Sequence, residues 1–212
     1  MKQMKNFLKK NYKLIIIFIC LILILEIMED LFEEEIMMKD VIGYQLVSTL
    51  ISEKTLPIAK FITNFGGVIW LLIFSTILFI FIKNKKIGIC IYANLFLSGA
   101  LNQILKRIVQ RPRPTEFRLI DESGYSFPSG HSMVSTAFYG LLIYIIYKKV
   151  KKPYLKISLI ILLSLLIFCI GISRIYLGVH YTSDVLAGFL ISISYLIVFT
   201  NSIKYFVIDK EE

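Results

Sequence analysis

Charged residues are scarce in this sequence, at 18% of 212 residues, whereas 57% of the residues are hydrophobic. This composition is too apolar for an ordinary soluble domain of this length and indicates a protein whose solvent is a membrane. Histidine occurs only twice, and the three cysteines are scattered among apolar runs. Such spacing excludes a disulfide framework or a Cys/His metal set, so we interpret the cysteines as packing residues.

Long apolar runs are abundant. A helix needs about 20 mostly apolar residues to cross a hydrocarbon core about 30 Å thick. Six runs approach that length, and they cover approximately Leu14 to Met28, Gly66 to Ile82, Ile87 to Leu105, Met133 to Tyr147, Leu155 to Ser173 and Val185 to Thr200. A cleaved signal peptide is the alternative for the first run, but Leu25 to Glu29 makes a poor small-residue cleavage site. We therefore predict an all-α integral membrane protein with six transmembrane helices. No repeat or linker divides residues 1–212, so we expect a single membrane-embedded domain.

The net charge of +9 is distributed unevenly among the connections. Lysines gather before the first run, at 83–86 and at 148–156, all on one side of a six-span arrangement. The acidic run Glu29 to Glu35 lies on the other side. By the positive-inside rule, this distribution predicts a multi-pass protein of the cell membrane with both termini in the cytoplasm. It reports topology, so we expect no nucleic-acid partner.

The segment from Asp30 to Pro57 carries apolar residues at helical spacing among charges. This pattern predicts a helix lying in the outer membrane interface. An ordinary packed helix that caps the bundle fits the pattern equally well.

The outward connections hold the residues with chemical potential. At the end of the third run, Lys106 lies near the last helical turn, and two prolines hold Arg113 in an extended chain. The two cations can therefore converge on one anion. The alternative is a solvated basic cap that binds lipid head groups, and it suits Arg107, Arg111 and Arg118.

A second segment, Pro128-Ser129-Gly130-His131, comes immediately before the fourth run. A turn that leads into a helix points free backbone N–H groups at a bound anion. Gly130 permits close approach, the Ser129 hydroxyl can donate a hydrogen bond, and His131 is a candidate general acid. The alternative is a capped helix start with an incidental histidine.

A third segment, from Ser173 to Asp184, joins the fifth and sixth runs. His180 and Asp184 are four positions apart, so they share a face if a helix begins there. Asp184 can then orient the imidazole and leave one ring nitrogen of His180 to attack phosphorus. Arg174 offers a planar fork for two phosphoryl oxygens. An Asp-His pair that only caps a helix is the alternative.

Together the three segments resemble the type 2 phosphatidic acid phosphatase superfamily, whose signature is Lys-x6-Arg-Pro, Pro-Ser-Gly-His and Ser-Arg-x5-His-x3-Asp. The match lies between residues 106 and 184. The resemblance implies a helical bundle of the phosphatidic acid phosphatase and haloperoxidase type. It also implies a phosphohistidine mechanism in which His180 is the nucleophile, Asp184 orients it and His131 protonates the leaving oxygen. The implied phosphate cradle comprises Lys106, Arg113, Ser129, Gly130 and Arg174. We expect no cofactor and no metal.

The compact form of these motifs is similar to bacterial undecaprenyl-diphosphate phosphatases and phosphatidylglycerophosphatases of this superfamily. We therefore expect a lipid substrate on the outer face, first of all undecaprenyl diphosphate, which would be hydrolysed to the monophosphate. Phosphatidylglycerophosphate or phosphatidic acid is the alternative substrate. A phosphotransferase and a non-catalytic lipid-binding membrane protein are further alternatives.

Overall fold

The structure is a computed structural model that describes residues 2–33 and 37–208. Within these residues it contains eight α-helices and no strand, which confirms the prediction of an all-α protein. In chain order the helices are α1 (Lys2–Glu33), α2 (Met38–Ser48), α3 (Thr55–Asn64), α4 (Val68–Phe81), α5 (Lys85–Val109), α6 (Gly130–Lys149), α7 (Pro153–Tyr176) and α8 (Thr182–Ile208). Parts of the predicted charge pattern, Glu34, Glu35 and the side chains of Lys2, Lys5 and Lys9, lie outside the described residues.

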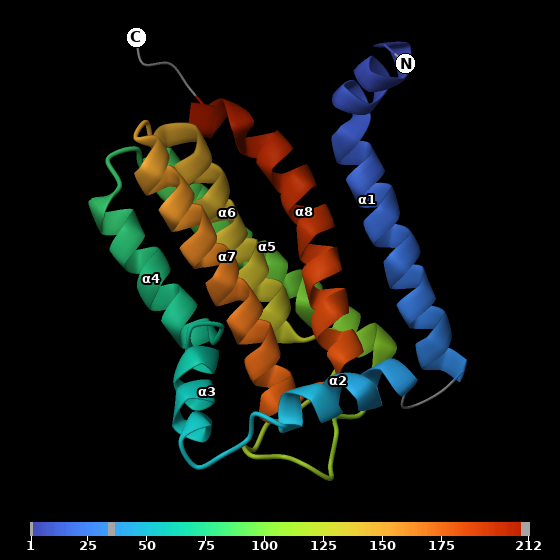
Figure 1. Cartoon of the computed structure of the whole chain (residues 1–212). Helices are drawn as coiled ribbons and strands as arrows, with labels where there is room; N and C mark the ends of the chain where they lie inside the picture. The colour runs from blue at the N-terminus through green and yellow to red at the C-terminus, as the bar shows by residue number, and fades with distance from the viewer. Residues whose placement is uncertain (1, 34–36, 209–212) are drawn as a thin grey trace.

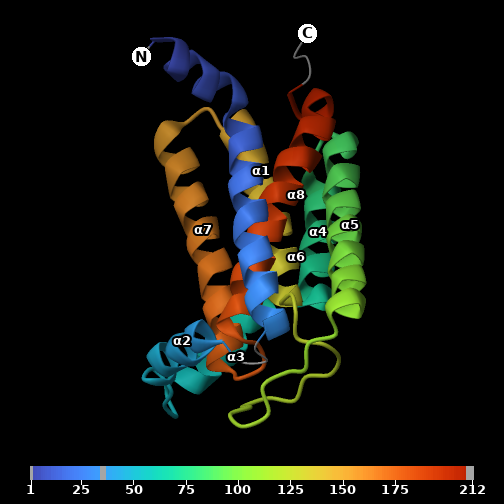
Figure 2. The ribbon, with the colours of Figure 1, turned by 90° about the vertical axis from the view of Figure 1, so that its right-hand side faces the viewer.

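Six helices, α1 and α4 to α8, run lengthwise side by side, while α2 and α3 lie at one end (Figures 1 and 2). The start of α1 and the end of α8 both lie at the opposite end (Figure 1). α6 is the central helix, because it packs against α5, α7 and α8. Every residue from 132 to 139 is buried, and small side chains such as Ser132 and Ser135 let the neighbouring helices approach closely.

Local sequence signals explain where several helices begin. The Asn84 side chain accepts a hydrogen bond from the Lys86 N–H at 3.0 Å and caps α5. Pro153 stands in the first turn of α7, where the missing N–H costs nothing. α7 then presents large apolar side chains such as Leu162 and Phe168 on the outside of the bundle, as a lipid-facing helix does.

Four helices in the described part of the chain, α5 to α8, are long and apolar enough to cross a membrane. α3 and α4 together form a fifth candidate, broken by a bend of 53°. The predicted run Gly66 to Ile82 is therefore only the second half of a bent pair. Leu14 to Met28 lies within α1, which is not among these candidates, so the count of six spans stays a prediction.

The break between α3 and α4 falls at Gly66 and Gly67. A Cβ atom built at Gly66 would lie 2.6 Å from Ile170 Cγ2 and 3.3 Å from the His131 Cβ. The absence of a side chain thus lets this turn press against α6 and α7. The bend thereby becomes a wall of the pocket described below.

The prediction of one helix from Asp30 to Pro57 is wrong, because this segment is divided among α1, α2 and α3. α2 packs across the ends of α7 and α8. Its close approach depends on Gly43, where a Cβ atom would lie 2.0 Å from Thr182 Oγ1. The position of α2 in a membrane interface stays a prediction.

Candidate active site

The connection from α5 to α6 carries the first two motifs across the end of the bundle. α5 ends at Val109, and Gln110 takes a left-handed conformation with φ of +52°. Its N–H donates to the Lys106 carbonyl at 2.9 Å, which closes the helix. Pro112 and Pro114 then keep the chain extended, as predicted, so Arg113 turns back into the protein, where it is buried.

Five of the predicted residues line one cavity of about 490 Å³: Lys106, Arg113, Gly130, His131 and His180. They come from the end of α5, the α5–α6 connection, the start of α6 and the α7–α8 turn. The bend at Gly66 and the side chains of Asn102 and Glu122 complete its walls. The fold therefore brings residues of all three motifs to a single cavity.

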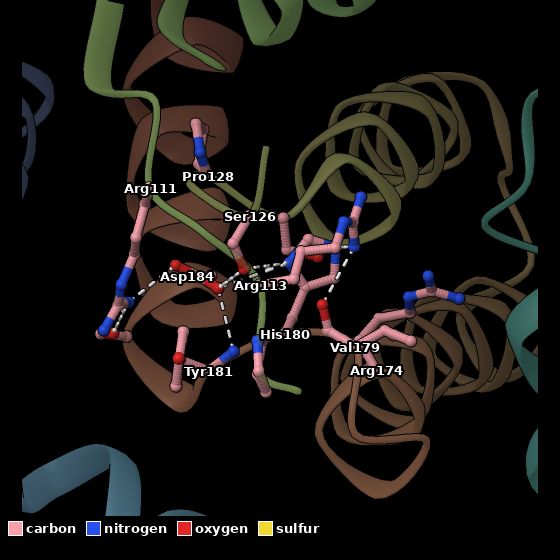
Figure 3. A network of polar contacts seen from close by, with 12 residues as sticks. Arg111, Arg113, Ser126, Pro128, Arg174, Val179, His180, Tyr181 and Asp184 are labelled. Carbon is pink, nitrogen blue, oxygen red and sulfur yellow. Dashed lines mark hydrogen bonds and ion pairs between the residues drawn. The ribbon is translucent and has the colours of Figure 1, made fainter. Parts of the chain in front are cut away.

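His180 lies in the turn between α7 and α8 and is buried. Its Nε2 atom is 3.0 Å from Arg113 Nη1, and its Nδ1 atom is 3.4 Å from Asp184 Oδ2 (Figure 3). An arginine can only donate, so Nε2 is the acceptor nitrogen and Nδ1 carries the ring hydrogen. Burial lowers the pKa of His180 to about 3, although the Asp184 carboxylate opposes the shift. The imidazole is therefore neutral, with its lone pair on Nε2.

The Asp184 carboxylate is held at both oxygens. Oδ1 accepts from Arg111 Nη1 at 2.9 Å, and Oδ2 accepts from the Tyr181 N–H at 2.9 Å. The Ser126 hydroxyl also donates to Oδ2 (Figure 3). Because the carboxylate is completely buried, these bonds fix its orientation toward His180.

The Arg113 guanidinium is fixed by three backbone carbonyls. Nε donates to Gly124 O, Nη2 to Ser123 O and Nη1 to Val179 O, each at 3.0 Å. Burial lowers the pKa of Arg113 below its usual value, but a guanidinium still keeps its charge. A fixed positive charge thus stands beside His180 Nε2.

Lys106 and His131 line the same cavity, Lys106 from the end of α5 and His131 from the start of α6. Lys106 Nζ donates to the Tyr125 carbonyl and, at 3.2 Å, to the Ser126 carbonyl. Both carbonyls are neutral, so the ammonium charge remains available to an anion. A Cβ atom built at Gly67 would lie 3.8 Å from His131 Nε2, which places the His131 ring against the α3–α4 bend.

Ser129 and Arg174 are near the cavity but do not line it. Ser129 caps α6: its Oγ accepts from the Ser132 N–H at 3.4 Å and from the Ser132 hydroxyl at 2.9 Å. Arg174 Nη1 donates to Thr63 Oγ1 at 2.7 Å, and Nη2 lies 3.1 Å from Glu122 Oε1. Direct contact of these two residues with a phosphate stays a prediction.

Sequence reasoning missed three residues of the site and was wrong about one of them. Arg107 and Arg118 are exposed, but Arg111 is buried and pairs with Asp184 and Asp40, so it is not part of a solvated cap. Ser126 and Asp40 were not anticipated at all. No local pattern marks Asp40, because it meets Arg111 across 71 positions of the chain.

The arrangement can hold a phosphoryl group and attack it. Cationic side chains from α5 and its following connection neutralise phosphate oxygens, and the first turn of α6 offers backbone N–H groups. A neutral imidazole with an oriented lone pair lies on one wall, and a second imidazole lies on the same cavity. This combination fits phosphoryl transfer to His180 with His131 as the proton donor.

Comparison with known proteins finds relatives that are named phosphatases. Residues 87–208 match the PAP2 superfamily. Over 92 residues the chain is 42% identical to phosphatidylglycerophosphatase B of Bacillus subtilis, which covers 42% of this chain and 44% of that protein. Over 167 residues it is 30% identical to undecaprenyl-diphosphatase of Sulfolobus acidocaldarius, which covers 74% of this chain and 73% of that protein. The first of these matches thus spans less than half of its relative.

A solved structure extends the similarity to nearly the whole chain. The crystal structure of a transmembrane PAP2 type phosphatidylglycerolphosphate phosphatase from Bacillus subtilis superposes with a TM-score of 0.79 at 26% identity. The superposition covers 95% of this chain and 100% of that chain. The helices before residue 87 therefore belong to the shared architecture as well.

Proposed function

This chain belongs to the PAP2 superfamily, as the match over residues 87–208 shows, and from that premise we propose that it is a membrane lipid phosphatase that works through a phosphohistidine. The observation that carries the proposal is the cavity shared by Lys106, Arg113, His131 and His180. The 3.0 Å contact between Arg113 Nη1 and His180 Nε2 supports the proposal, because it joins a cation that could bind phosphate to the nitrogen that would attack phosphorus.

The first half of the reaction transfers the phosphoryl group to the enzyme. The Nε2 lone pair of His180 forms a bond to phosphorus while the bond from phosphorus to the lipid oxygen breaks. His131 gives a proton to that oxygen, so the lipid leaves neutral at this atom. The positive charge that develops on the His180 ring is balanced by the Asp184 carboxylate, which stays ionised and accepts a hydrogen bond from Nδ1–H.

The second half returns the enzyme to its starting state. His131, now neutral, takes a proton from a water molecule that attacks phosphorus, and the bond from Nε2 to phosphorus breaks. Inorganic phosphate leaves with the charges on its oxygens held by Lys106, Arg113 and the Gly130 N–H. Arg174 and the start of α6, which Ser129 caps, add fixed positive potential to this cradle.

We propose undecaprenyl diphosphate as the first substrate, which would be converted to undecaprenyl phosphate and inorganic phosphate. The relative from Sulfolobus acidocaldarius supports this assignment, because it bears that activity in its name and 73% of its length is matched. Phosphatidylglycerophosphate is the second candidate. Its support is the 42% identity with the Bacillus subtilis relative and the structural similarity over 95% of this chain.

The test is phosphate release in detergent, in the presence of a chelator, from undecaprenyl diphosphate, phosphatidylglycerophosphate and phosphatidic acid in parallel. We expect wild type to be active and His180→Ala to be inactive, with Arg118→Met as the control for loss of an exposed arginine. The lipid with the highest kcat/KM names the substrate. Equal activity of wild type and His180→Ala would remove the phosphohistidine mechanism, and no release from any lipid would favour a non-catalytic lipid-binding protein. Loss of lipid phosphate without matching inorganic phosphate would identify a phosphotransferase.

We also propose that the cavity opens on the outer side of the cell membrane, with both chain ends in the cytoplasm. The start of α1 and the end of α8 lie at one end of the bundle, and the residues that line the cavity lie toward the other end, which supports this orientation. In a variant without the native cysteines, an impermeant thiol reagent added to intact cells should label Thr115→Cys and not Lys151→Cys. The reverse pattern would overturn the orientation.

A further inference from the structure

Arg111 is buried at the edge of the site, behind the carboxylate that faces His180. Its side chain is 2% exposed. Nη1 donates to Asp184 Oδ1 at 2.9 Å and to Ser183 Oγ at 2.7 Å. Oδ1 is the oxygen of Asp184 that faces away from the His180 ring. The Arg111 guanidinium therefore holds Oδ1 of Asp184, while the His180 ring contacts Oδ2.

Asp40, in the first turn of α2, is the second partner of this arginine. Its Oδ2 accepts from Arg111 Nη2 at 2.7 Å, and its side chain is 1% exposed. Asp40 also accepts from the Ser183 N–H at 2.8 Å and from the Ser183 hydroxyl at 2.9 Å. Both carboxylate oxygens of Asp40 are thus directed at Arg111 or at Ser183, the residue before Asp184.

We propose that Arg111 and Asp40 form a positioning bridge that holds Asp184 in register with His180, so that α2 is part of the catalytic apparatus. Neither bridge residue lines the cavity shared by His131 and His180. Asp40 lines a second cavity of about 600 Å³ that His180 also borders, but its carboxylate oxygens are bonded to Arg111 and Ser183, so the bridge acts through Asp184. The inference rests on the proposed function, because Asp184 needs a fixed orientation only if His180 is the nucleophile.

The charges around the bridge explain why both partners are needed. One guanidinium separates two buried carboxylates, and the planar fork lets Nη1 serve Asp184 while Nη2 serves Asp40. Without the carboxylate of Asp40, the guanidinium loses the contact that fixes its plane. Without the fork of Arg111, two buried carboxylates face each other with less compensation, and Asp184 can rotate away from Nδ1.

The Tyr181 ring closes the bridge from the remaining side. The Arg111 Cζ atom lies 3.9 Å from the centre of that ring, and the Tyr181 N–H donates to Asp184 Oδ2 at 2.9 Å. Tyr181, the residue after His180, therefore contacts both Arg111 and Asp184. A displacement of α2 would be transmitted through Asp40 and Arg111 to the Asp184–His180 pair.

The test compares Arg111→Lys and Asp40→Asn with two controls, in the purified full chain and with the best lipid substrate. Arg118→Met removes an exposed arginine, and Asp30→Asn removes a carboxylate that is 42% exposed and pairs with Lys39. We expect each bridge variant to lower kcat by about tenfold to a hundredfold, because small displacements of a catalytic group cost that much. KM should stay within about twofold of wild type, since the substrate contacts are unchanged. Both controls should keep the kcat of wild type.

Two further measurements separate positioning from folding. The double variant should lose no more than the worse single variant, because both changes break one bridge. Asp40→Glu should recover part of the kcat that Asp40→Asn loses. If Asp40→Asn does not fold, Arg111→Lys, which keeps the charge, carries the test alone. Bridge variants that turn over like the controls would overturn the inference and leave the proposed function intact, whereas an inactive wild type would overturn both.

Discussion

Arg113 Nη1 donates to His180 Nε2 at 3.0 Å, so the nitrogen that would attack phosphorus contacts the cation that would bind the phosphate. A phosphoryl group that enters between them exchanges one contact for two, because its oxygens accept from the guanidinium and its phosphorus faces the lone pair. The hydrogen bond from Arg113 thus keeps the imidazole in the tautomer whose Nε2 carries no hydrogen.

We predict that Arg113→Lys lowers kcat/KM by about a hundredfold or more. Lysine provides one charge but no planar fork, so it cannot serve the carbonyls of Gly124, Ser123 and Val179 at once. The chain before α6 should then lose its fixed path and the thermal stability in detergent should fall. Steady-state kinetics and a melting curve check both effects, and Arg118→Lys is the exposed control. A variant with wild-type kcat/KM would contradict the cradle role of Arg113.

The ionisation of His180 is directly measurable, because the sequence contains only two histidines. Burial lowers the pKa of His180 to about 3, against the opposing effect of Asp184. The ring should therefore stay neutral from pH 9 down to about pH 4, and the nucleophile should be lost only as the pH falls toward 3. In untagged His131→Gln labelled with ¹⁵N-histidine, the remaining signal should show the Nδ1–H tautomer without titration between pH 5 and 9. A midpoint near pH 6.5 would rule out this neutral, buried state.

Each of the three motifs is a local pattern with its own chemistry, and residues from all three meet at one cavity, while their catalytic roles stay a prediction. Lys106, Arg113, Gly130, His131 and His180 were all expected, and all line one cavity. These residues could be located from sequence because the proline-rich turn and the helix start both shape the backbone locally. Apolar runs likewise located α5, α6 and α7 to within a few residues of their ends and the start of α8, whereas α8 continues to Ile208, beyond the predicted Thr200.

Tertiary pairing was invisible to the same reasoning. The contact of Arg111 with Asp40 joins the site to a helix far away in the chain, and nothing in the arginine-rich segment distinguishes a buried arginine from a solvated one. The break at Gly66 and Gly67 was missed for a related reason. The predicted run begins at Gly66, so it covers α4 and leaves out α3, and only the close approach to Ile170 and His131 requires the turn.

Gly178 offers a test of the turn that carries His180. Its φ is +66°, and a Cβ atom there would lie 2.1 Å from the Phe117 carbonyl oxygen, which is backbone and cannot move aside. We predict that Gly178→Ala lowers the melting temperature and the activity together. Gly99→Ala is the matched control for the melting temperature alone, since Gly99 lines the cavity; a Cβ atom there meets nothing within 4 Å, and helix α5 gains propensity. Equal melting temperatures for the two variants would contradict the strain argument.

The roles of the two histidines can be separated by the leaving group. If His131 protonates the lipid oxygen, then a substrate whose leaving oxygen needs no proton should depend on it far less. We predict that His131→Ala loses about a hundredfold or more in kcat with a lipid phosphate but much less with a nitrophenyl phosphate. His180→Ala should lose activity on both substrates, because it removes the bond-forming atom itself.

Formation of the covalent intermediate gives this comparison its control. With the nitrophenyl substrate, His131→Ala should still release a burst of nitrophenol equal to the enzyme concentration, followed by a slow phase, because the water that attacks the phosphohistidine has lost its base. His180→Ala should show no burst. Equal losses of His131→Ala on both substrates would mean that His131 acts in binding the phosphate and not in proton transfer, and a burst in His180→Ala would move the nucleophile to another residue.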